Sequence, residues 1–209
     1  MNLTVVDHPV AQHLLAALRD RSTPPATFRA VTKRLAWLLL VEASRDLPVR
    51  AALVHTPLED TDARMLAEPV VVVPILRAGL GLLDAATELL PEVMVGYLGL
   101  ERDEATFEPS AYYANLPPMK GSRTFILDPM LATGGSARSA IASVKKAGAA
   151  DVRMVAVVAA PEGIAAVHSE HPDVHIVTAS VDRGLNDAAY ILPGLGDFGD
   201  RLFGTLPQG

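Results

Sequence analysis

Residues 123–136 read RTFILDPMLATGGS, and this stretch decides the fold that we expect. An apolar run ending at Asp128 predicts a buried strand, and a helical pattern begins at Ser136. The loop between them brings two glycines and two hydroxyl groups to the start of the helix. Free N–H groups and the helix dipole attract an anion at such a position. The loop therefore favours phosphate binding over its alternative, a plain strand-to-helix turn capped by Ser or Thr.

The details of this loop narrow the kind of phosphate ligand. No lysine follows the glycines, so the stretch is not a GxxxxGK[ST] phosphate loop, and it is not a GxGxxG dinucleotide turn. Asp128 lies at the carboxyl end of the predicted strand, where open α/β sheets bind their ligands. A carboxylate there can accept hydrogen bonds from sugar hydroxyls. An acid followed by Thr-Gly-Gly-Ser therefore indicates a sugar phosphate.

Other short runs rich in β-branched residues have the same apolar character as the predicted strand that ends at Asp128. They are nearly continuous in apolar character, which is typical of parallel strands covered on both faces. Helical patterns lie between several of them, and this alternation predicts an α/β fold with a mainly parallel central sheet flanked by helices. The strands are expected at residues 70–76, 93–98, 124–127, 152–160 and 174–181, with helices at 80–90 and 136–147.

Two more helices are predicted at the N-terminus, before the first strong strand. Val10, Leu14, Leu15 and Leu18 share one helical face, with Asp7 as the expected cap. A second pattern runs from Phe28 to Leu39, and there the expected cap is Thr23, with Pro24 and Pro25 in the first turn.

Two segments break the alternation of strand and helix. Residues 99–121 are polar and contain adjacent tyrosines, and a loop of this length is a covering flap or a plain surface hairpin. Residues 182–209 are rich in Gly and Pro. Glycine allows close approach to a ligand, but taken alone such a tail is more often a surface coil.

Composition limits the class of protein. The 209 residues fit one domain, and the net charge of -6 without a basic stripe argues against nucleic-acid binding. The absence of cysteine suits a reducing cytoplasm. The N-terminal residues lack the pattern of a signal peptide, and no apolar run is long enough to predict a membrane span. The six histidines show no metal-ligand spacing, so no metal site built from protein side chains is expected.

The string DPMLATGGS, residues 128–136, resembles the loop that binds 5-phosphoribosyl 1-diphosphate (PRPP) in the uracil phosphoribosyltransferases. Further matches follow in family order and extend the resemblance over essentially the whole chain. They are His8-Pro9, Gln12-His13, Arg45-Asp46, PILRAGLG at 74–81, AAPEG at 159–163, PGLGD at 193–197 and GDR at 199–201. The resemblance implies a phosphoribosyltransferase-type fold in a single domain, residues 1–209, with a flexible flap at about 99–121 and a base-binding hood at about 182–209.

The resemblance also implies an activity. The enzyme would be a pentosyltransferase that converts uracil and PRPP to UMP and diphosphate in pyrimidine salvage. Mg²⁺ would be bound mainly through PRPP rather than by the protein. Homodimers or higher homo-oligomers are expected in the family, and GTP is a candidate activator.

Site residues follow from the same resemblance. Arg77 and Arg102 would contact PRPP. Without the resemblance, the alternative for Arg77 is a surface salt bridge, against which the flanking apolar strand and following glycines count, and Arg102 would be interpreted as a solvated charge in a charge run. Asp128 and Asp197 would complete the catalytic set. The full PRPP-binding set is Arg77, Arg102, Asp128, Pro129, Met130, Leu131, Ala132, Thr133, Gly134, Gly135, Ser136 and Asp197. Uracil would be bound largely through main-chain groups of Ile191, Gly196, Asp197 and Phe198.

Three positions depart from the family pattern. Phe198 stands where Ala is usual, Asn115 where Lys is usual, and Ala189 where Gly is common. If the Phe198 ring entered the base pocket, affinity or base choice would change. Two rival functions stay open: a transferase for another base, and a regulator of this fold that senses PRPP or UMP without catalysis.

Overall fold

The central sheet is parallel except at one edge. The computed structural model describes residues 2–102 and 109–205. The strands follow the order β1-β11-β10-β8-β4-β6-β7, and only β7 pairs antiparallel. Two short strands, β5 and β9, pair with β4 and β10. The bounds are β1 Leu3–Val5, β4 Val70–Leu76, β5 Met94–Val95, β6 Tyr97–Arg102, β7 Pro109–Asn115, β8 Arg123–Leu127, β9 Met130–Leu131, β10 Asp151–Ala159 and β11 His175–Val181.

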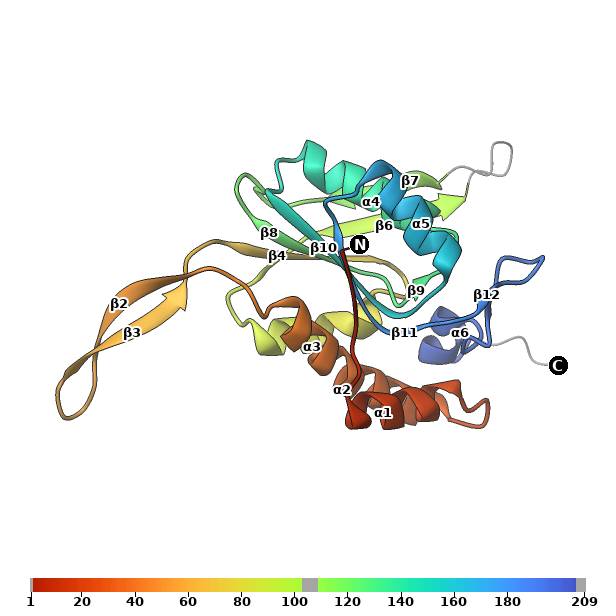
Figure 1. Ribbon diagram of the computed structural model, residues 1–209, viewed down its shortest axis with the longest axis horizontal. Helices are drawn as coiled ribbons and strands as arrows, with labels where there is room; N and C mark the ends of the chain where they lie inside the picture. The colour runs from red at the N-terminus through yellow and green to blue at the C-terminus, as the bar shows by residue number, and fades with distance from the viewer. Residues whose placement is uncertain (1, 103–108, 206–209) are drawn as a thin grey trace.

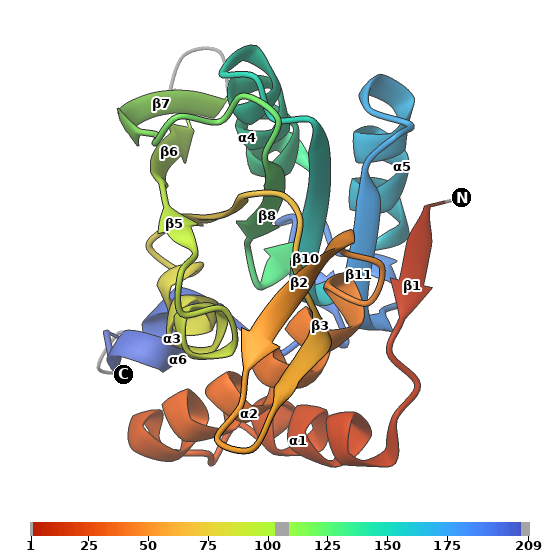
Figure 2. The same cartoon turned by 90° about the vertical axis from the view of Figure 1, so that its left-hand side faces the viewer.

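Helices cover both faces of this sheet (Figure 1 and Figure 2). One face carries α1, α2 and α3, with α6 packed beside α2, and the opposite face carries α4 and α5. The bounds are α1 Pro9–Arg19, α2 Pro25–Ala43, α3 Leu80–Leu89, α4 Gly135–Lys146, α5 Pro161–Glu170 and α6 Phe198–Phe203. The predicted α/β fold with a mainly parallel sheet is confirmed. Within the described residues, no helix combines the length and apolar character needed to span a bilayer.

The apolar run at residues 70–73 shows why the sheet could be predicted. Val70 and Val72 pack into the cluster beneath α1, α2 and α3, whereas Val71 and Val73 pack into the cluster beneath α4 and α5. Side chains alternate between the two faces of a strand, so a strand covered on both faces needs apolar residues at every position.

Both predicted helix caps are wrong. His8, not Asp7, precedes α1, and its Nδ1 accepts from the Val10 N–H at 3.1 Å. Pro24 precedes α2 without a side-chain cap, and the Thr23 hydroxyl instead donates to the Ala17 carbonyl at 2.7 Å. The expected residues lie next to the helix starts, and for Thr23 a contact with the preceding helix α1 takes its hydroxyl away from the capping position.

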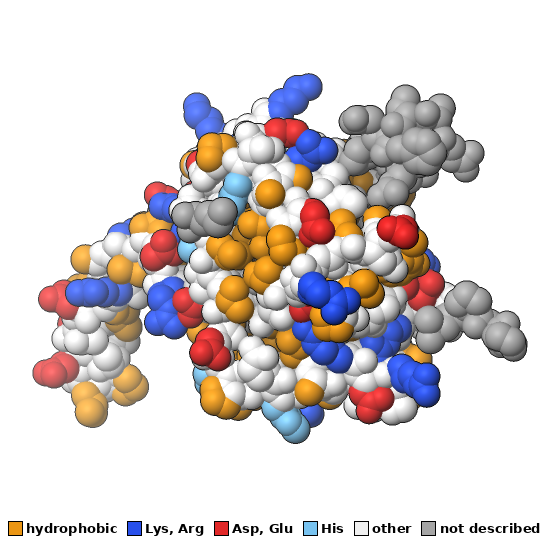
Figure 3. Space-filling view, turned by 45° about the vertical axis from the view of Figure 1, so that its right-hand side comes forward, with side chains coloured by type: hydrophobic (Ala, Val, Ile, Leu, Met, Phe, Trp, Pro, Cys, Tyr) orange, Lys and Arg blue, Asp and Glu red, His pale blue; other side chains and the backbone are white. Residues whose placement is uncertain are grey.

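A two-stranded arm projects from the body, and the sequence patterns did not predict it. Strands β2 (Val49–His55) and β3 (Asp60–Leu66) pair antiparallel and form a sheet of their own. The arm stands clear of the body (Figure 1), and Figure 3 shows hydrophobic and charged side chains together on its surface. Leu53 is 61% exposed and Leu58 is 95% exposed, so the arm has no apolar core of its own.

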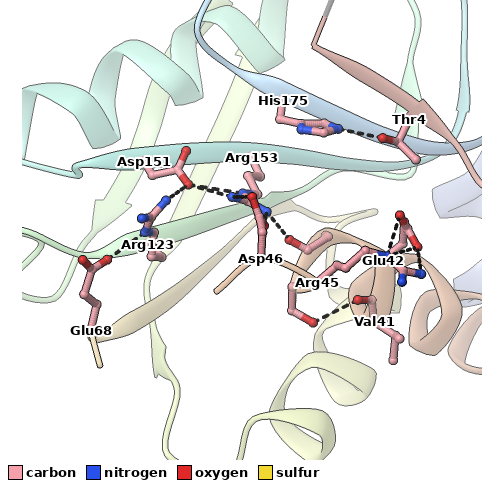
Figure 4. Close-up of polar contacts among 12 residues, drawn as sticks. Thr4, Val41, Glu42, Arg45, Asp46, Glu68, Arg123, Asp151, Arg153 and His175 are labelled. Carbon is pink, nitrogen blue, oxygen red and sulfur yellow. Dashed lines mark hydrogen bonds and ion pairs between the residues drawn. The ribbon is translucent and has the colours of Figure 1, made fainter. Parts of the chain in front are cut away.

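An ion-pair chain holds both roots of the arm (Figure 4). Asp46, just before β2, binds Arg153 through both carboxylate oxygens, one of them at 3.1 Å. Arg153 reaches Asp151 at 2.9 Å, and Asp151 binds Arg123. Arg123 in turn binds Glu68, just after β3, at 2.7 Å. The alternating charges therefore tie the entry and exit of the arm to strands β8 and β10.

The two segments that broke the sequence pattern form recognisable structures. In the segment 99–121, the ends of β6 and β7 make an antiparallel hairpin, whereas its tip lies outside the described residues. The described part of the segment 182–209, which ends at residue 205, has regular structure and is not a surface coil. It forms a small antiparallel pair, β12 (Gly184–Leu185) with β13 (Ile191–Leu192), followed by α6.

Candidate active site

The loop after β8 has the geometry expected of a phosphate site. Helix α4 begins at Gly135, and Gly134 precedes it in the left-handed region at φ +81°. The side chains of Thr133 and Ser136 are exposed beside the helix N-terminus. The N–H groups of the first helical turn have no intrahelical acceptor. Donors from the main chain and from hydroxyl groups therefore gather at one place.

Close packing against α5 explains the glycines in this region. A Cβ on Gly134 would lie 2.9 Å from the Gly163 carbonyl oxygen. A Cβ on Gly163 would lie 2.4 Å from the Ala132 oxygen, which is shorter than any normal contact. The loop backbone is thus pressed against the start of α5, and both positions require the smallest residue.

Asp128 lies at the carboxyl end of β8, at the base of this loop. Burial raises the pKa of its carboxyl to about 7, and a hydrogen bond from the Met130 N–H opposes that shift. This bond is long, at 3.4 Å. The carboxyl group is therefore ready to accept stronger hydrogen bonds from a ligand hydroxyl.

Arg77 follows β4, the neighbour of β8 in the sheet. Its side chain is 61% exposed, lies 3.5 Å from the Asp200 carboxylate and stands 5.8 Å over the Phe203 ring. Because β4 and β8 run parallel with Pro74 opposite Leu127, Arg77 and Asp128 leave the sheet at the same edge. The surface ion pair exists, but it is long and exposed, so the guanidinium can still reach an anion.

Arg102 is the last residue of β6, on the other side of β4. Leu76 pairs with Gly99, so β6 continues past the end of β4 toward the edge that carries Arg77. The Arg102 side chain lies outside the described part of the chain, and its contact with PRPP stays a prediction. Asn115 ends β7 opposite Tyr97, at the base of the hairpin.

The C-terminal segment, residues 184–205, lies beside the sheet edge that carries Arg77 and Asp128. Leu185 pairs with Ile191, whose side chain is buried, and Gly196 is exposed with φ +79°. Asp197 precedes α6 and accepts from the Asp200 N–H at 2.8 Å, so one of its roles is to cap the helix. At Gly199, an added Cβ would lie 4.0 Å from the Ala78 side chain, which places α6 against the turn after Arg77.

The Phe198 ring points into the core and away from the exposed side of this segment. It is 2% exposed and meets the Phe28 ring edge-on, with centroids 5.1 Å apart. A ligand on the exposed side could therefore meet only the main chain of Phe198. The ring that stands where Ala is usual packs against Phe28 of α2.

Residues of this edge that sequence reasoning did not assign are Asp200, beside Arg77, and Arg201, buried beneath the loop 194–197. Both belong to the string GDR, which was noted without individual roles. Within residues 2–102 and 109–205, no group of three or more His, Cys, Asp or Glu side chains is arranged to hold a metal ion.

Solved structures share this architecture. The AQ2163 protein from Aquifex aeolicus superposes with a TM-score of 0.92 at 39% identity, covering 96% of this chain and 97% of that one. An orotate phosphoribosyltransferase from Mycobacterium tuberculosis, solved in complex with PRPP, gives a TM-score of 0.51 at 17% identity, over 84% of this chain and 91% of that one. This second likeness shows the phosphoribosyltransferase fold.

Sequence comparison is more specific. A protein from Salinibacter ruber named uracil phosphoribosyltransferase is 49% identical over 205 residues, covering 98% of each chain. One of the same name from Oceanobacillus iheyensis is 48% identical over 206 residues, covering 98% of this chain and 99% of that one. The family model described as uracil phosphoribosyltransferase matches residues 5–205. With these matches over nearly the whole chain, and with the loop 128–136, Arg77 and the C-terminal segment at one sheet edge, the chain belongs to the uracil phosphoribosyltransferase family.

Proposed function

We propose that this enzyme transfers the 5-phosphoribosyl group of PRPP to N1 of uracil and releases UMP and diphosphate. The observation that carries the proposal is the shared edge of β4 and β8, where the loop 128–136 and Arg77 lie together. The full-length similarity to proteins named for this activity supports the choice of uracil.

The loop 128–136 and Arg77 fit the two ends of PRPP. The N–H groups at the start of α4, with the Thr133 and Ser136 hydroxyls, suit the 5-phosphate. Asp128 would accept hydrogen bonds from the ribose hydroxyls. Arg77 would bind the diphosphate, because a guanidinium offers paired donors to phosphate oxygens. The main chain and side chains of residues 129–132 complete the loop.

In the proposed reaction, the C1–O bond to diphosphate breaks and a C1–N1 bond forms. The diphosphate leaves with the electron pair, and the N1 proton passes to water. Negative charge grows on the leaving group, so Arg77 and Arg102 would act by electrostatic stabilisation. Holding both substrates in line removes much of the entropic barrier. If the hairpin of β6 and β7 closes as a flap, it would exclude the water that otherwise hydrolyses PRPP.

Mg²⁺ is the proposed cofactor. The donors near the site suit an ion held mainly by substrate oxygens and water, because Mg²⁺ retains several waters and needs only one or two carboxylates. Asp197 is the carboxylate that would lie nearest the ion, beside its cap bond from the Asp200 N–H. When bound, the ion would neutralise charge on the diphosphate.

Uracil would be bound by main-chain groups of Ile191 and residues 196–198. A backbone N–H aimed at an exocyclic oxygen accepts uracil but meets the amino group of cytosine with donor against donor. A site that leaves a buried donor unpaired rejects such an analogue strongly. The inward direction of the Phe198 ring is compatible with this main-chain recognition.

The enzyme is also proposed to form a homodimer or higher homo-oligomer through its arm. An isolated two-stranded hairpin is at best marginally stable in water, and exposed apolar side chains on a projecting element favour a protein partner. A groove beside the arm root is lined by Met65, Leu66, Leu89 and Leu90. A second copy is the proposed occupant of this surface.

A cytoplasmic location and activation by GTP complete the proposal. The lack of cysteine is the support for the location. Activation by GTP is checked by initial rates at subsaturating PRPP, with and without the nucleotide. A higher rate with GTP, but not with ATP, is the expected result.

The test of function is incubation with PRPP, Mg²⁺ and labelled uracil, with UMP followed by chromatography. Cytosine and thymine serve as parallel substrates. UMP from uracil alone is expected. A nucleotide formed mainly from another base would overturn the base assignment, and PRPP binding without any nucleotide formation would favour the regulator.

A further inference from the structure

Arg201 carries a buried charge whose direct hydrogen-bond partners, among the described residues, are not carboxylates; the nearest acidic influence is the Asp20 carboxylate. It lies on α6 with 8% of its surface exposed, and its guanidinium carbon stands 4.5 Å over the Phe28 ring. Its partners are backbone carbonyls: Leu195 at 2.7 Å, Asp20 at 2.6 Å, and Leu18. A buried cation is strongly destabilising unless its hydrogen bonds are well made, so the guanidinium and these carbonyls hold one another in place.

The acceptors join two distant parts of the chain. Leu18 and Asp20 lie at the end of α1, where helix carbonyls lack intrahelical donors and carry partial negative charge. Leu195 lies in the loop between β13 and α6. Arg201 therefore fastens this loop to the end of α1, and it does so through the main chain.

A second arginine holds the preceding residue of the same loop. Arg19 donates to the Gly194 carbonyl at 2.7 Å and to both oxygens of Asp182 at 2.6 and 2.8 Å. Asp182 also accepts from the Gly194 N–H at 2.8 Å. Both main-chain groups of Gly194 are thus fixed, and the loop approaches Gly196 in a defined direction.

The planar peptide between Leu195 and Gly196 also fixes the direction of the Gly196 N–H. The Leu195 carbonyl and the Gly196 N–H belong to one rigid trans unit and point in opposite directions. Arg201 holds the carbonyl from the buried side, so the N–H faces away from the core. Gly196 is exposed, and among the described residues no acceptor takes its N–H. The same segment packs against the turn after Arg77.

We infer that Arg201 is a positioning residue for the base: by holding the Leu195 carbonyl it aims the Gly196 N–H at a carbonyl oxygen of the pyrimidine. This inference rests on the proposed transfer to uracil. It identifies a residue that touches neither substrate yet controls the donor that reads the base. PRPP would keep its main contacts, the loop after β8 and Arg77. Asp197 is held separately by its cap bond from the Asp200 N–H, so the KM for PRPP should change much less than the KM for uracil.

The test replaces Arg201 by Lys, which keeps the charge. A single ammonium cannot span the three carbonyl acceptors of the guanidinium fork. The KM for uracil should rise about tenfold or more, while the KM for PRPP stays within about twofold. The preference for uracil over cytosine should fall in the same variant.

Arg29, on α2, offers a matched control because it also holds α6 through a backbone carbonyl. It donates to the Leu202 carbonyl of α6 at 2.8 Å, and this bond does not involve the loop 194–197. Arg29→Lys should lower the melting temperature without raising the KM for uracil. A general loosening of α6 would affect both variants alike, so the contrast in KM separates positioning from stability.

Arg19→Lys provides a second route to the same loop if Arg201→Lys does not fold. It should raise the KM for uracil and spare the KM for PRPP, because it frees Gly194. Unchanged KM values for uracil in folded Arg201 or Arg19 variants, beside an active wild type, would overturn the inference alone. A wild type that forms no UMP would overturn the proposed function as well.

Discussion

At the residue scale, Asp128 shows how burial prepares a side chain for a ligand. Its pKa is raised to about 7 because the carboxyl group is buried and has only a long hydrogen bond. The charged form accepts hydrogen bonds from sugar hydroxyls more strongly than the neutral form. PRPP affinity in the wild type should therefore increase as pH rises from 6 to 8, measured by calorimetry.

Asp128→Asn separates this effect from the ionisation of PRPP itself. The variant should bind PRPP more weakly. Between pH 6 and 8 its affinity should change only as the ionisation of PRPP dictates, without the further increase that Asp128 gives the wild type. Folding stability should change with pH in the opposite direction to PRPP affinity. A carboxyl with a raised pKa binds its proton more tightly when folded, so the ligand-free wild type should lose stability relative to the variant as pH rises from about 4 to 7. Parallel affinity curves for the two proteins would contradict the assignment.

Ala189 illustrates strain at a single residue. It has φ 60°, the left-handed region, where a side chain costs roughly 1–2 kcal/mol. Replacing Ala189 by glycine would relieve this strain, but glycine also raises the conformational entropy of the unfolded chain, which offsets part of the stabilisation. Ala189→Gly should therefore stabilise the protein by about 0.5 kcal/mol in urea unfolding. Its neighbour supplies the control: Ala188 has a negative φ, so Ala188→Gly should not stabilise.

At the scale of elements, the arm depends on its root. Arg153 has a 7% exposed side chain and connects Asp46, Asp151 and the Ala43 carbonyl. Arg153→Gln would leave Asp151 facing Arg123 alone and Asp46 without its cation. Because Arg153 is buried while Asp46 is 70% exposed, the loss should be smaller than for a fully buried pair, about 1–2 kcal/mol, and should appear in urea unfolding. Hydrogen exchange in β2 and β3 should also speed up.

The exposed ion pair of Arg45 with Glu42 is the control for that experiment, because it lies near the same root and Arg45 is 71% exposed. Arg45→Gln should leave stability and exchange nearly unchanged. Arg153 holds the pKa of Asp46 below its usual range. The stabilisation from Asp46 is thus present above its unfolded pKa and is lost as pH falls. If Arg153→Gln and Arg45→Gln changed stability and hydrogen exchange equally, the ion pairs of Arg153 would not be what holds the arm.

Comparison of elements also shows what a sequence can reveal. The run at 70–73 predicted its strand because burial on both faces leaves a continuous apolar signature. The arm left no such signature: residues 49–66 are mostly exposed, and their pairing is stabilised at the root by residues far along the chain. The string DPMLATGGS identified the loop, whereas the direction of the Phe198 ring depends on Phe28, which no local pattern connects to it.

At the scale of the whole molecule, the body and the arm differ in how far they bury their apolar side chains. The body buries its apolar side chains on both sides of the sheet, but the arm exposes Leu53, Leu58 and Met65. A monomer would keep these side chains in water on an element with few contacts to the body (Figure 1). Burial against a second copy would remove this unfavourable exposure, with apolar area contributing roughly 25 cal/mol per Å².

Sedimentation at micromolar concentration tests this prediction. The wild type should be a dimer or larger, and the double variant Leu53→Ser, Leu58→Ser should dissociate toward monomer. Val10→Ser is the control, because Val10 is 50% exposed on α1 in the body. Since the loop 128–136 and Arg77 lie on the body, the monomeric variant should still bind PRPP. A monomeric wild type, or an arm variant that assembles as the wild type does, would show that the arm has another partner.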